Sequence, residues 1–249
     1  MKTILITGSN GAIGQGLCQN FSDKGWRVIG TDLNENSRGN TNFYFSIDLD
    51  RLCTDEVYCD QSIKNIISEL NDGLDVLVNN AATQILAPVK ELTFKSWQKT
   101  ININLSSVFI LVKGLLPELE GNKGNVVNIS SVHAILTKPN FSAYATSKAG
   151  LIGLTKSLAV ELGSCIRVNA ICPAAIDTPM LHDGFNDNPN GLSELKSYHP
   201  TACIGSVKDM VNSVVFLSDN NNNFLNGSIL DLSGGISSSL HDPILEQKS

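Results

Sequence analysis

The amino-acid sequence predicts a single α/β domain, a doubly wound parallel sheet that spans residues 1–249. The first observation is the alternation, along the whole chain, of short apolar runs of strand length with longer segments of helical spacing. The second is a glycine-rich loop, residues 7–14, directly between the first apolar run and the first helical segment. No internal repeat or linker divides the chain into further units.

Each predicted strand is a short run of apolar and β-branched residues, as expected for strands that are buried on both faces. The predicted strands are residues 2–7, 26–31, 43–47, 74–78, 124–129, 166–171 and 228–232. Each predicted helix has apolar residues at intervals of three and four positions. The predicted helices are residues 15–24, 52–71, 97–116, a helix that holds Tyr144 and continues through 151–162, and 207–217.

The first strand leads into the glycine loop, which holds Gly8, Gly11 and Gly14. Glycines let the backbone approach a pyrophosphate closely, and the N-terminus of the following helix carries partial positive charge. Strand, glycine loop and helix in this order therefore predict a site for a dinucleotide cofactor.

Asp32 follows the second strand, about 20 residues after the loop, where a carboxylate binds the adenosine ribose hydroxyls and repels a 2′-phosphate. The glycine loop itself contains no lysine or arginine. Both observations favour NAD over NADP, while Arg38 is an argument for NADP because it is close enough to reach a 2′-phosphate. Asp48, after the third strand, is a candidate for contact with the adenine.

The fourth strand ends in Asn79-Asn80-Ala81-Ala82, and small residues there allow a cofactor to pass closely. The next predicted helix contains Asn102 and Asn104, which are unusual inside a helix. They are surface or capping residues, or polar groups placed for function.

Tyr144 and Lys148 are four residues apart on a predicted helix and therefore share one face. A lysine ammonium beside a phenol favours the phenolate, which makes the tyrosine a better general acid and base. A Tyr-x-x-x-Lys spacing alone is a weak signal. However, Gly8, Asp32, Asn79, Ser131 and Pro173 all follow strands, and ligands of doubly wound sheets bind at that end.

The composition excludes several classes of partner. The formal net charge is −6 with no basic run, which argues against nucleic acid and anionic membranes. No run of about 18 apolar residues predicts a membrane span. The six cysteines and four histidines have no metal-ligand spacing, so we expect no metal, free thiols and a cytoplasmic location.

Together these residues resemble the short-chain dehydrogenase/reductase family, in its compact single-domain branch, over about residues 3–236. The resemblance rests on the glycine loop, Asn79-Asn80-Ala81-Ala82, Asn104-Leu105, Ser131 with Tyr144 and Lys148, Pro173 with Thr178, and Gly227 with Gly234-Gly235. It implies the Rossmann fold, a nicotinamide cofactor and a homo-oligomer, either a dimer or a tetramer.

The resemblance also implies roles for single residues. Tyr144 is the general acid and base, Ser131 binds the substrate oxygen, and Lys148 binds the nicotinamide ribose and lowers the pKa of Tyr144. Asn104 holds a water in a proton relay. The residues implied to bind the cofactor are Gly8, Asn10, Gly11, Ala12, Ile13, Gly14, Asp32, Asp48, Leu49, Asn79, Ala81, Tyr144, Lys148, Pro173, Ile176 and Thr178. Those expected to face the substrate are Ser131, His133, Phe141, Ala174 and Met180.

Three positions depart from the family pattern. The middle glycine of the loop is replaced by Ala12, with Gly11 one position earlier, a spacing found in the larger, epimerase-like branch. Ala174 follows Pro173 where a glycine is usual, and Cys203 stands where an arginine is common.

Two C-terminal segments carry expectations of their own. Residues 180–205 include a polar, aperiodic stretch that predicts a substrate-binding loop or lid, and the tail after residue 237 is expected to be flexible. The leading functional hypothesis is an NAD-dependent oxidoreductase that acts on a secondary alcohol and ketone pair. The alternatives are an NADP-dependent 3-oxoacyl carrier-protein reductase and a non-catalytic NAD-binding regulator.

Overall fold

The computed structural model describes residues 1–185, 188 and 190–240. Within this part of the chain, seven parallel strands form one sheet in the order β3-β2-β1-β4-β5-β6-β7. The strands are β1 (Thr3–Thr7), β2 (Arg27–Asp32), β3 (Phe43–Ser46), β4 (Val76–Asn79), β5 (Asn125–Ile129), β6 (Arg167–Pro173) and β7 (Ile229–Leu232). The predicted fold class, a doubly wound parallel sheet, is confirmed.

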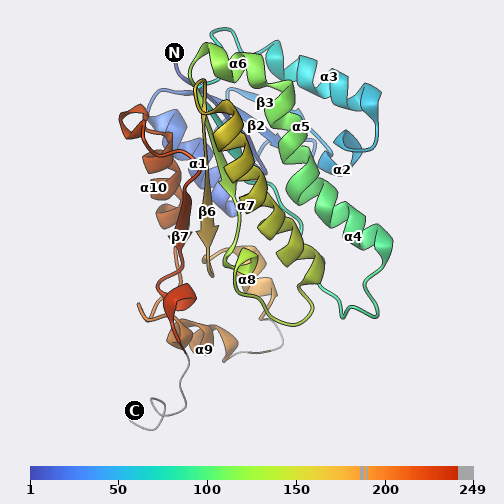
Figure 1. Ribbon diagram of the computed structural model, residues 1–249, viewed down its shortest axis with the longest axis vertical. Coiled ribbons are helices and arrows are strands. Elements are labelled where there is room, and N and C mark those ends of the chain that lie inside the picture. Colours follow the sequence, from blue (N-terminus) through green and yellow to red (C-terminus); the bar gives the residue numbers. More distant parts are fainter. Residues whose placement is uncertain (186–187, 189, 241–249) are drawn as a thin grey trace.

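Helices cover both faces of the sheet. They are α1 (Ala12–Asp23), α2 (Leu49–Leu52), α3 (Glu56–Ile67), α4 (Phe94–Ile101), α5 (Ser107–Gly114), α6 (Leu116–Gly121), α7 (Ser142–Leu162), α8 (Pro179–Asp183), α9 (Gly191–Tyr198) and α10 (Val207–Ser218). Helices α1 and α10 pack on one face, and α3, α5 and α7 pack on the other (Figure 1). The strand arrows point toward the end of the molecule at which α8 and α9 lie (Figure 1).

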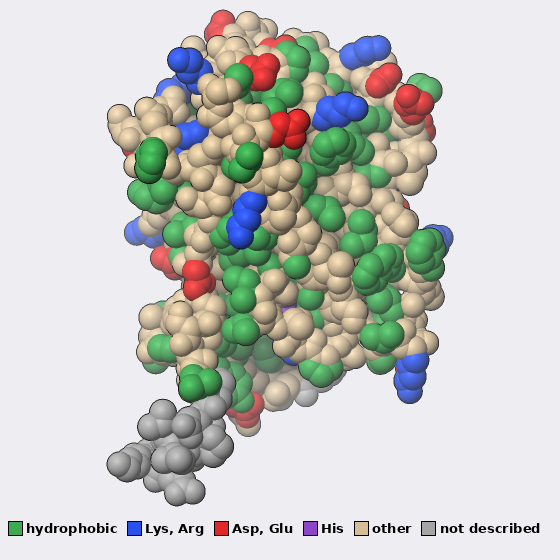
Figure 2. Space-filling model, in the orientation of Figure 1, with side chains coloured by type: hydrophobic (Ala, Val, Ile, Leu, Met, Phe, Trp, Pro, Cys, Tyr) green, Lys and Arg blue, Asp and Glu red, His purple; other side chains and the backbone are tan. Residues whose placement is uncertain are grey.

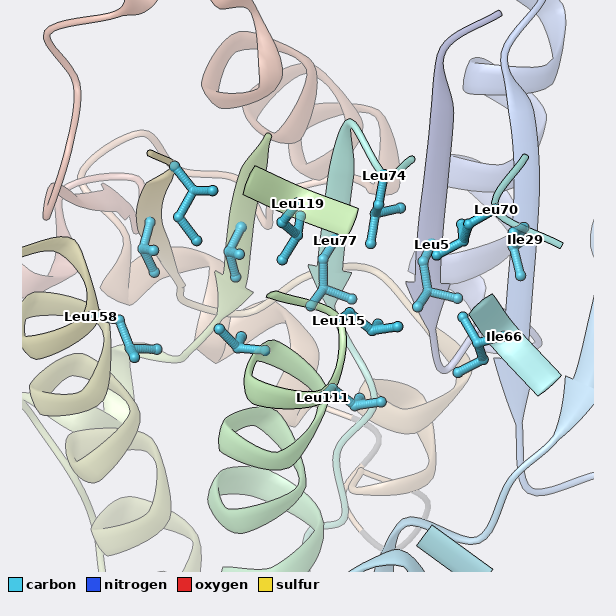
Figure 3. Packing of buried hydrophobic residues seen from close by; sticks show 14 of the residues in the cluster. Leu5, Ile29, Ile66, Leu70, Leu74, Leu77, Leu111, Leu115, Leu119 and Leu158 are labelled. Atoms are coloured by element: carbon cyan, nitrogen blue, oxygen red, sulfur yellow. The ribbon is translucent and has the colours of Figure 1, made fainter. Parts of the chain in front are cut away.

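The hydrophobic core consists of two layers, one on each side of the sheet. Successive residues of β1 alternate between them, so Leu5 joins one cluster and Ile4 joins the other. Leu5 and Leu77 lie in the same cluster as Leu111 of α5 and Leu115, the residue that follows α5 (Figure 3). Each of these leucines is at most 2% exposed and contributes roughly 1.5–3 kcal/mol by leaving water. The sheet is therefore a rigid base for its loops.

The predicted helix over residues 97–116 is not continuous. A π-helical segment, Asn102–Ser106, separates α4 from α5, and α6 starts a new helix at Leu116 with a proline in its first turn. The asparagines of the π segment have distant partners. The Asn102 amide donates to Asp50 Oδ1 at 2.8 Å, and both Asn102 and Asn104 are buried. Tertiary hydrogen bonds thus override the local helical pattern here.

The segment 180–205, predicted to be a loop, contains the two short helices α8 and α9. Thr178 begins α8, since its hydroxyl accepts from the Leu181 N–H at 3.4 Å and Pro179 occupies the first helical position. Residues 186, 187 and 189 of this segment lie outside the described residues. Of the tail after 237, only residues 238–240 are described, and Ile236–Ser238 forms a turn of 3₁₀ helix. Among the described helices, none is long and apolar enough to cross a membrane.

Candidate active site

The strand order reverses between β1 and β4, which opens a crevice at the carboxyl ends of these strands. The backbone that follows β1 and β4 borders this crevice. The Thr7 hydroxyl accepts from the N–H groups of Asn80 and Ala81, both at 3.0 Å. A Cβ atom on Gly8 would lie 2.8 Å from the Cα of Ala81, and Gly8 has a φ of +65°. Only glycine fits at this position.

The glycine loop leaves the N-terminus of α1 free for an anion. A Cβ atom on Gly14 would lie 2.1 Å from the Gly8 oxygen, so the loop packs closely on itself. Gly11 precedes α1, has a φ of −72° and provides no side-chain cap, and the first turn holds no acidic residue. The N–H groups at the start of α1 are therefore available to a pyrophosphate, and the donors present fit a dinucleotide.

The departure at Ala12 has a simple structural basis. Ala12 is the first residue of α1, where any residue with helical dihedrals fits. A Cβ atom on Gly11 would meet only the Gly8 oxygen, at 3.5 Å. Close packing thus requires Gly8 and Gly14, which match the family pattern, and does not require a glycine at either position between them.

Asp32, Asp48 and Leu49 lie beyond the adjacent strands β2 and β3. Asp32 Oδ2 accepts from the Asn10 N–H at 3.1 Å, and Oδ1 accepts from the Leu33 N–H at 2.8 Å. Asp48 caps α2, with Oδ1 accepting from the N–H groups of the next helical residues, and Leu49 begins that helix. The structure therefore brings the residues predicted to bind the adenosine half of the cofactor to the same end of the sheet.

The side chain of Asn79, a predicted cofactor-binding residue, is hydrogen-bonded within the protein. Its amide donates to Asn128 Oδ1 at 2.8 Å, and the Asn128 amide donates to the Thr155 hydroxyl at 2.9 Å. Asn79 is 3% exposed, and among the described residues its Oδ1 has no hydrogen-bond partner. This side chain connects two strands to α7, which leaves the backbone of Asn79 as the part that borders the crevice.

Ser131, Tyr144 and Lys148 meet at the end of β5. Ser131 follows that strand, and its hydroxyl accepts from the His133 N–H at 3.2 Å. Tyr144 and Lys148 lie one turn apart on α7, with the lysine Nζ 5.7 Å from the centre of the tyrosine ring. Lys148 Nζ also donates to the Ile129 carbonyl at 2.7 Å, and this residue is 2% exposed. The helix period and the strand end together produce the arrangement that the sequence predicted.

Burial shifts the pKa values of Tyr144 and Lys148. It raises the pKa of Tyr144 above its ordinary value, and a hydrogen bond with Ser131 opposes the rise. Burial also lowers the pKa of Lys148 to about 8, with an opposing effect from Cys172. The implied effect of Lys148 on the pKa of Tyr144 stays a prediction.

Asn104 connects the π segment to α7. Its Oδ1 accepts from the Thr83 N–H at 2.8 Å, and its amide donates to the Thr83 carbonyl at 2.9 Å and to Ser147 Oγ at 3.0 Å. Of the two interpretations left open by the sequence, the structure supports a polar group placed beside the site. The side chain is occupied by protein partners, so Asn104 acts on the neighbouring elements.

An aromatic wall lies beside Tyr144. The rings of His133 and Phe141 stack at 4.1 Å, and both meet the Tyr144 ring edge to face, at 5.9 and 6.1 Å. Burial, followed by the charge of Lys138, lowers the pKa of His133 to about 4, which keeps its ring neutral near pH 7. The wall is thus uncharged.

The remaining predicted residues follow β6. Ala174 N–H donates to the Leu232 carbonyl of β7 at 3.1 Å, Ile176 forms a bridge with Gly205, and Thr178 caps α8. Met180, in α8, is 61% exposed. All of these residues follow Pro173, the last residue of β6, and so lie at the same end of the sheet. Nothing in the structure explains Cys203 in place of an arginine.

Two serines near the site were not predicted. Ser130 Oγ donates to the Lys148 carbonyl at 3.0 Å, and Ser147 Oγ donates to the Tyr144 carbonyl at 2.7 Å. Each fixes the backbone of α7 next to a predicted catalytic residue. Their positions directly beside Ser131 and Lys148 in the sequence were the available signal.

Comparison with known proteins identifies the family. A family model described as enoyl-(acyl carrier protein) reductase matches residues 8–237. An uncharacterized oxidoreductase of Schizosaccharomyces pombe is 33% identical over 240 residues, which are 94% of this chain and 90% of the relative. A 3beta-hydroxysteroid dehydrogenase of Eggerthella lenta is 30% identical over 245 residues, covering 94% and 93% of the two chains. Dehydrogenase/reductase SDR family member 6 of Xenopus laevis is 31% identical over 240 residues, covering 94% and 96%.

Solved structures agree with this assignment. The ligand-free aldohexose dehydrogenase of Thermoplasma acidophilum has a TM-score of 0.87 and 30% identity, and 97% of each chain is covered. A 4-hydroxyisoleucine dehydrogenase in complex with NADH has a TM-score of 0.87 and 30% identity, with 96% and 100% covered. ElxO with bound NADP has a TM-score of 0.84 and 28% identity, with 96% and 99% covered. The chain therefore belongs to the short-chain dehydrogenase/reductase family of oxidoreductases, as its sequence motifs implied.

Proposed function

We propose that this protein is an NAD-dependent dehydrogenase that interconverts a secondary alcohol and a ketone. The observation that carries the proposal is the meeting of Ser131, Tyr144 and Lys148 at the sheet end that also holds the uncapped N-terminus of α1. A protein that only bound the cofactor would have no need of a half-buried phenol and a buried ammonium beside a hydroxyl. This argues against the alternative of a non-catalytic regulator.

The proposed mechanism assigns one task to each side chain. The bound cofactor supplies a hydride acceptor at nicotinamide C4. In alcohol oxidation, Tyr144 acts as the phenolate: its Oη takes the proton of the substrate hydroxyl, while the hydrogen on the carbon that bears this hydroxyl leaves as hydride. Ser131 donates a hydrogen bond to the substrate oxygen and keeps it within reach of the phenol. Lys148 stabilises the phenolate by its positive charge. The hydrogen bond with Ser131 also favours the phenolate, against the burial that raises the pKa of Tyr144.

The position of Asp32 supports NAD as the cofactor. Its carboxylate is partly exposed at the end of β2 and repels a 2′-phosphate, while the glycine loop provides no positive charge to bind one. The backbone N–H of Arg38 donates to Asn10 Oδ1 at 2.7 Å, which fixes the backbone at this residue. The lack of positive charge also disfavours the alternative of an NADP-dependent 3-oxoacyl carrier-protein reductase.

We propose a small molecule as the substrate, bound against the neutral wall of His133 and Phe141. Ala174 and Met180 would border it from the side of β6. We also propose a homo-oligomer, since α5 and α7 present an open apolar hollow to solvent. The described residues include six cysteines, all free, which supports a reducing, cytoplasmic location.

The test is turnover of a panel of sugars, polyols, steroids and acyl thioesters with NAD and with NADP, followed by nicotinamide absorbance. Tyr144→Phe should keep the fold and bind NAD like the parent, while losing most turnover, because the ring packing remains and the proton donor is gone. Calorimetric titration with NAD separates binding from chemistry. Turnover of the variant within about tenfold of the parent would contradict the assignment of Tyr144.

A further inference from the structure

The side chain of Asn10, in the glycine loop, is hydrogen-bonded to the segment after β2 and to β3. Its amide donates to the Asn36 carbonyl at 2.9 Å and to Tyr44 Oη at 3.1 Å. Its Oδ1 accepts from the Arg38 N–H at 2.7 Å. Asn10 is 7% exposed. Sequence reasoning made Asn10 a cofactor ligand, but its polar atoms hold residues 33–38, the segment that follows β2.

Tyr44 holds the same segment through a second hydrogen bond. It projects from β3, and its hydroxyl donates to the Asn34 carbonyl. Burial, followed by the charge of Asp32, raises the pKa of Tyr44, so the phenol stays protonated and remains a donor. The Ser46 hydroxyl, also on β3, donates to the Leu33 carbonyl at 3.1 Å. Side chains from two different elements thus fix the backbone of a surface segment.

Asp32 is the third member of this network. Its Oδ1 accepts from the Leu33 N–H at 2.8 Å and from the Asn34 side-chain amide at 3.2 Å. Its Oδ2 accepts only from the Asn10 N–H, at 3.1 Å, among the described residues. An ionised carboxylate oxygen accepts more than one hydrogen bond, so Oδ2 retains capacity for a ligand hydroxyl. The orientation of this oxygen depends on the segment that Asn10 and Tyr44 fasten.

We propose that Asn10 and Tyr44 are positioning residues for cofactor selectivity. They hold residues 33–38 so that Asp32 presents Oδ2 to the ribose hydroxyls and Arg38 stays tethered through its backbone. The proposal rests on the proposed preference for NAD. If the segment is released, Asp32 turns more freely and the Arg38 guanidinium can approach a 2′-phosphate. Both changes favour NADP relative to NAD.

The experiment compares Tyr44→Phe and Asn10→Ala with the parent. For each protein, kcat and KM are measured with NAD and with NADP, and the melting temperature is recorded. Both variants should lower the ratio of kcat/KM for NAD to that for NADP by about tenfold, through KM rather than kcat. Tyr58→Phe is the matched control, because its hydroxyl accepts from the Asp48 N–H at 2.9 Å and does not contact residues 33–38. Any change that it causes in kcat/KM should be the same with NAD and with NADP, so that their ratio stays at the parent value.

The outcomes separate this inference from the proposed function. An unchanged ratio in a folded Tyr44→Phe variant overturns the inference, even if Asn10→Ala fails to fold. A lower melting temperature with an unchanged ratio has the same meaning, since it shows a purely structural role. A parent that prefers NADP contradicts the proposed cofactor instead. In that case a change in the ratio of kcat/KM for NAD to that for NADP in Tyr44→Phe, in either direction, still supports positioning by the segment. An unchanged ratio rejects it.

Discussion

The side-chain amide of Asn104 donates a hydrogen bond of 3.0 Å to the hydroxyl of Ser147, the residue that precedes Lys148. This bond joins the π-helical segment to α7 across 43 positions of sequence. Ser147 in turn donates to the Tyr144 carbonyl at 2.7 Å. The segment that interrupts the helix over 97–116 is therefore connected directly to the backbone that carries the proposed acid and base.

Asn104→Ala should lower kcat by about tenfold or more and leave KM for NAD near the parent value. The change removes the bond to Ser147 and leaves the Thr83 N–H without its partner, at a cost of about 1–3 kcal/mol in stability. Steady-state kinetics with denaturant unfolding measures both effects. Ser147→Ala is the comparison variant. It removes the contact with Asn104 and the bond to the Tyr144 carbonyl but leaves both bonds between Asn104 and Thr83, so it should have a smaller effect on kcat. Equal kcat in Asn104→Ala and parent would reject this role.

Ser131→Ala should lower kcat/KM by about 10²–10³-fold, by analogy with the loss of one donor to a developing negative oxygen. A hydrogen bond with its side chain opposes the raised pKa of Tyr144. Ser130→Ala is a useful comparison, because Ser130 donates to the Lys148 carbonyl at 3.0 Å and should affect stability more than turnover. If kcat/KM of Ser131→Ala equals that of the parent, Ser131 does not contact the substrate.

Features that follow from a local period were predictable from sequence. Tyr144 and Lys148 share a face because a helix repeats nearly every four residues, and Gly8 follows a strand because a close turn needs it. The π segment was not predictable, because its causes are contacts such as Asn102 with Asp50, 52 positions apart. The start of α8 was missed although its signal, Thr178 followed by Pro179, was present.

The buried lysine gives a dependence of stability on pH. The pKa of Lys148 is lowered by burial from 10.5 to about 8. Between these values the unfolded chain binds the proton and the folded protein does not, so the free energy of unfolding rises with pH through this window. The free energy of unfolding of the parent, measured relative to that of Lys148→Met, should therefore increase by up to about 3 kcal/mol as the pH is raised from below 8 to about 10.5. Urea unfolding of both proteins measures this difference, and a difference independent of pH would contradict it.

His133 gives the corresponding dependence in acid. Burial, followed by the charge of Lys138, lowers its pKa from 6.5 to about 4. Between these values the unfolded chain holds the extra proton, so stability present above pH 6.5 is lost as the pH falls toward 4. His133→Gln keeps a polar side chain and does not titrate, so its melting temperature should fall less than that of the parent across this window. If the melting temperatures of the two proteins fell by the same amount across this pH window, His133 would not be buried against Phe141.

The final prediction concerns assembly through α5 and α7. An open hollow of about 450 Å³ lies between them, lined by Leu105, Ser106, Phe109, Gly150, Gly153, Leu154 and Ser157. Hydrophobic side chains gather on this face, with charged ones mostly at its edges (Figure 2). Phe109 is 47% exposed, and a Cβ atom on Gly153 would meet nothing within 4 Å. The described part of the chain therefore leaves this hollow uncovered, and small residues on α7 allow another helix to approach closely.

We expect a second copy of the chain to cover the hollow, since one apolar face of this kind on each protomer suits a two-fold symmetric contact. Phe109→Glu should then dissociate the oligomer at micromolar concentration, because pairing would bury two unpartnered carboxylates. Val57→Glu is the matched control, with the same charge change at a residue of α3 that is 80% exposed. Light scattering should give a multiple of 26.7 kDa for the parent and for the control, and a lower mass for Phe109→Glu. A parent mass near 26.7 kDa would contradict assembly. If Phe109→Glu stayed oligomeric, the contact between copies would lie on another face.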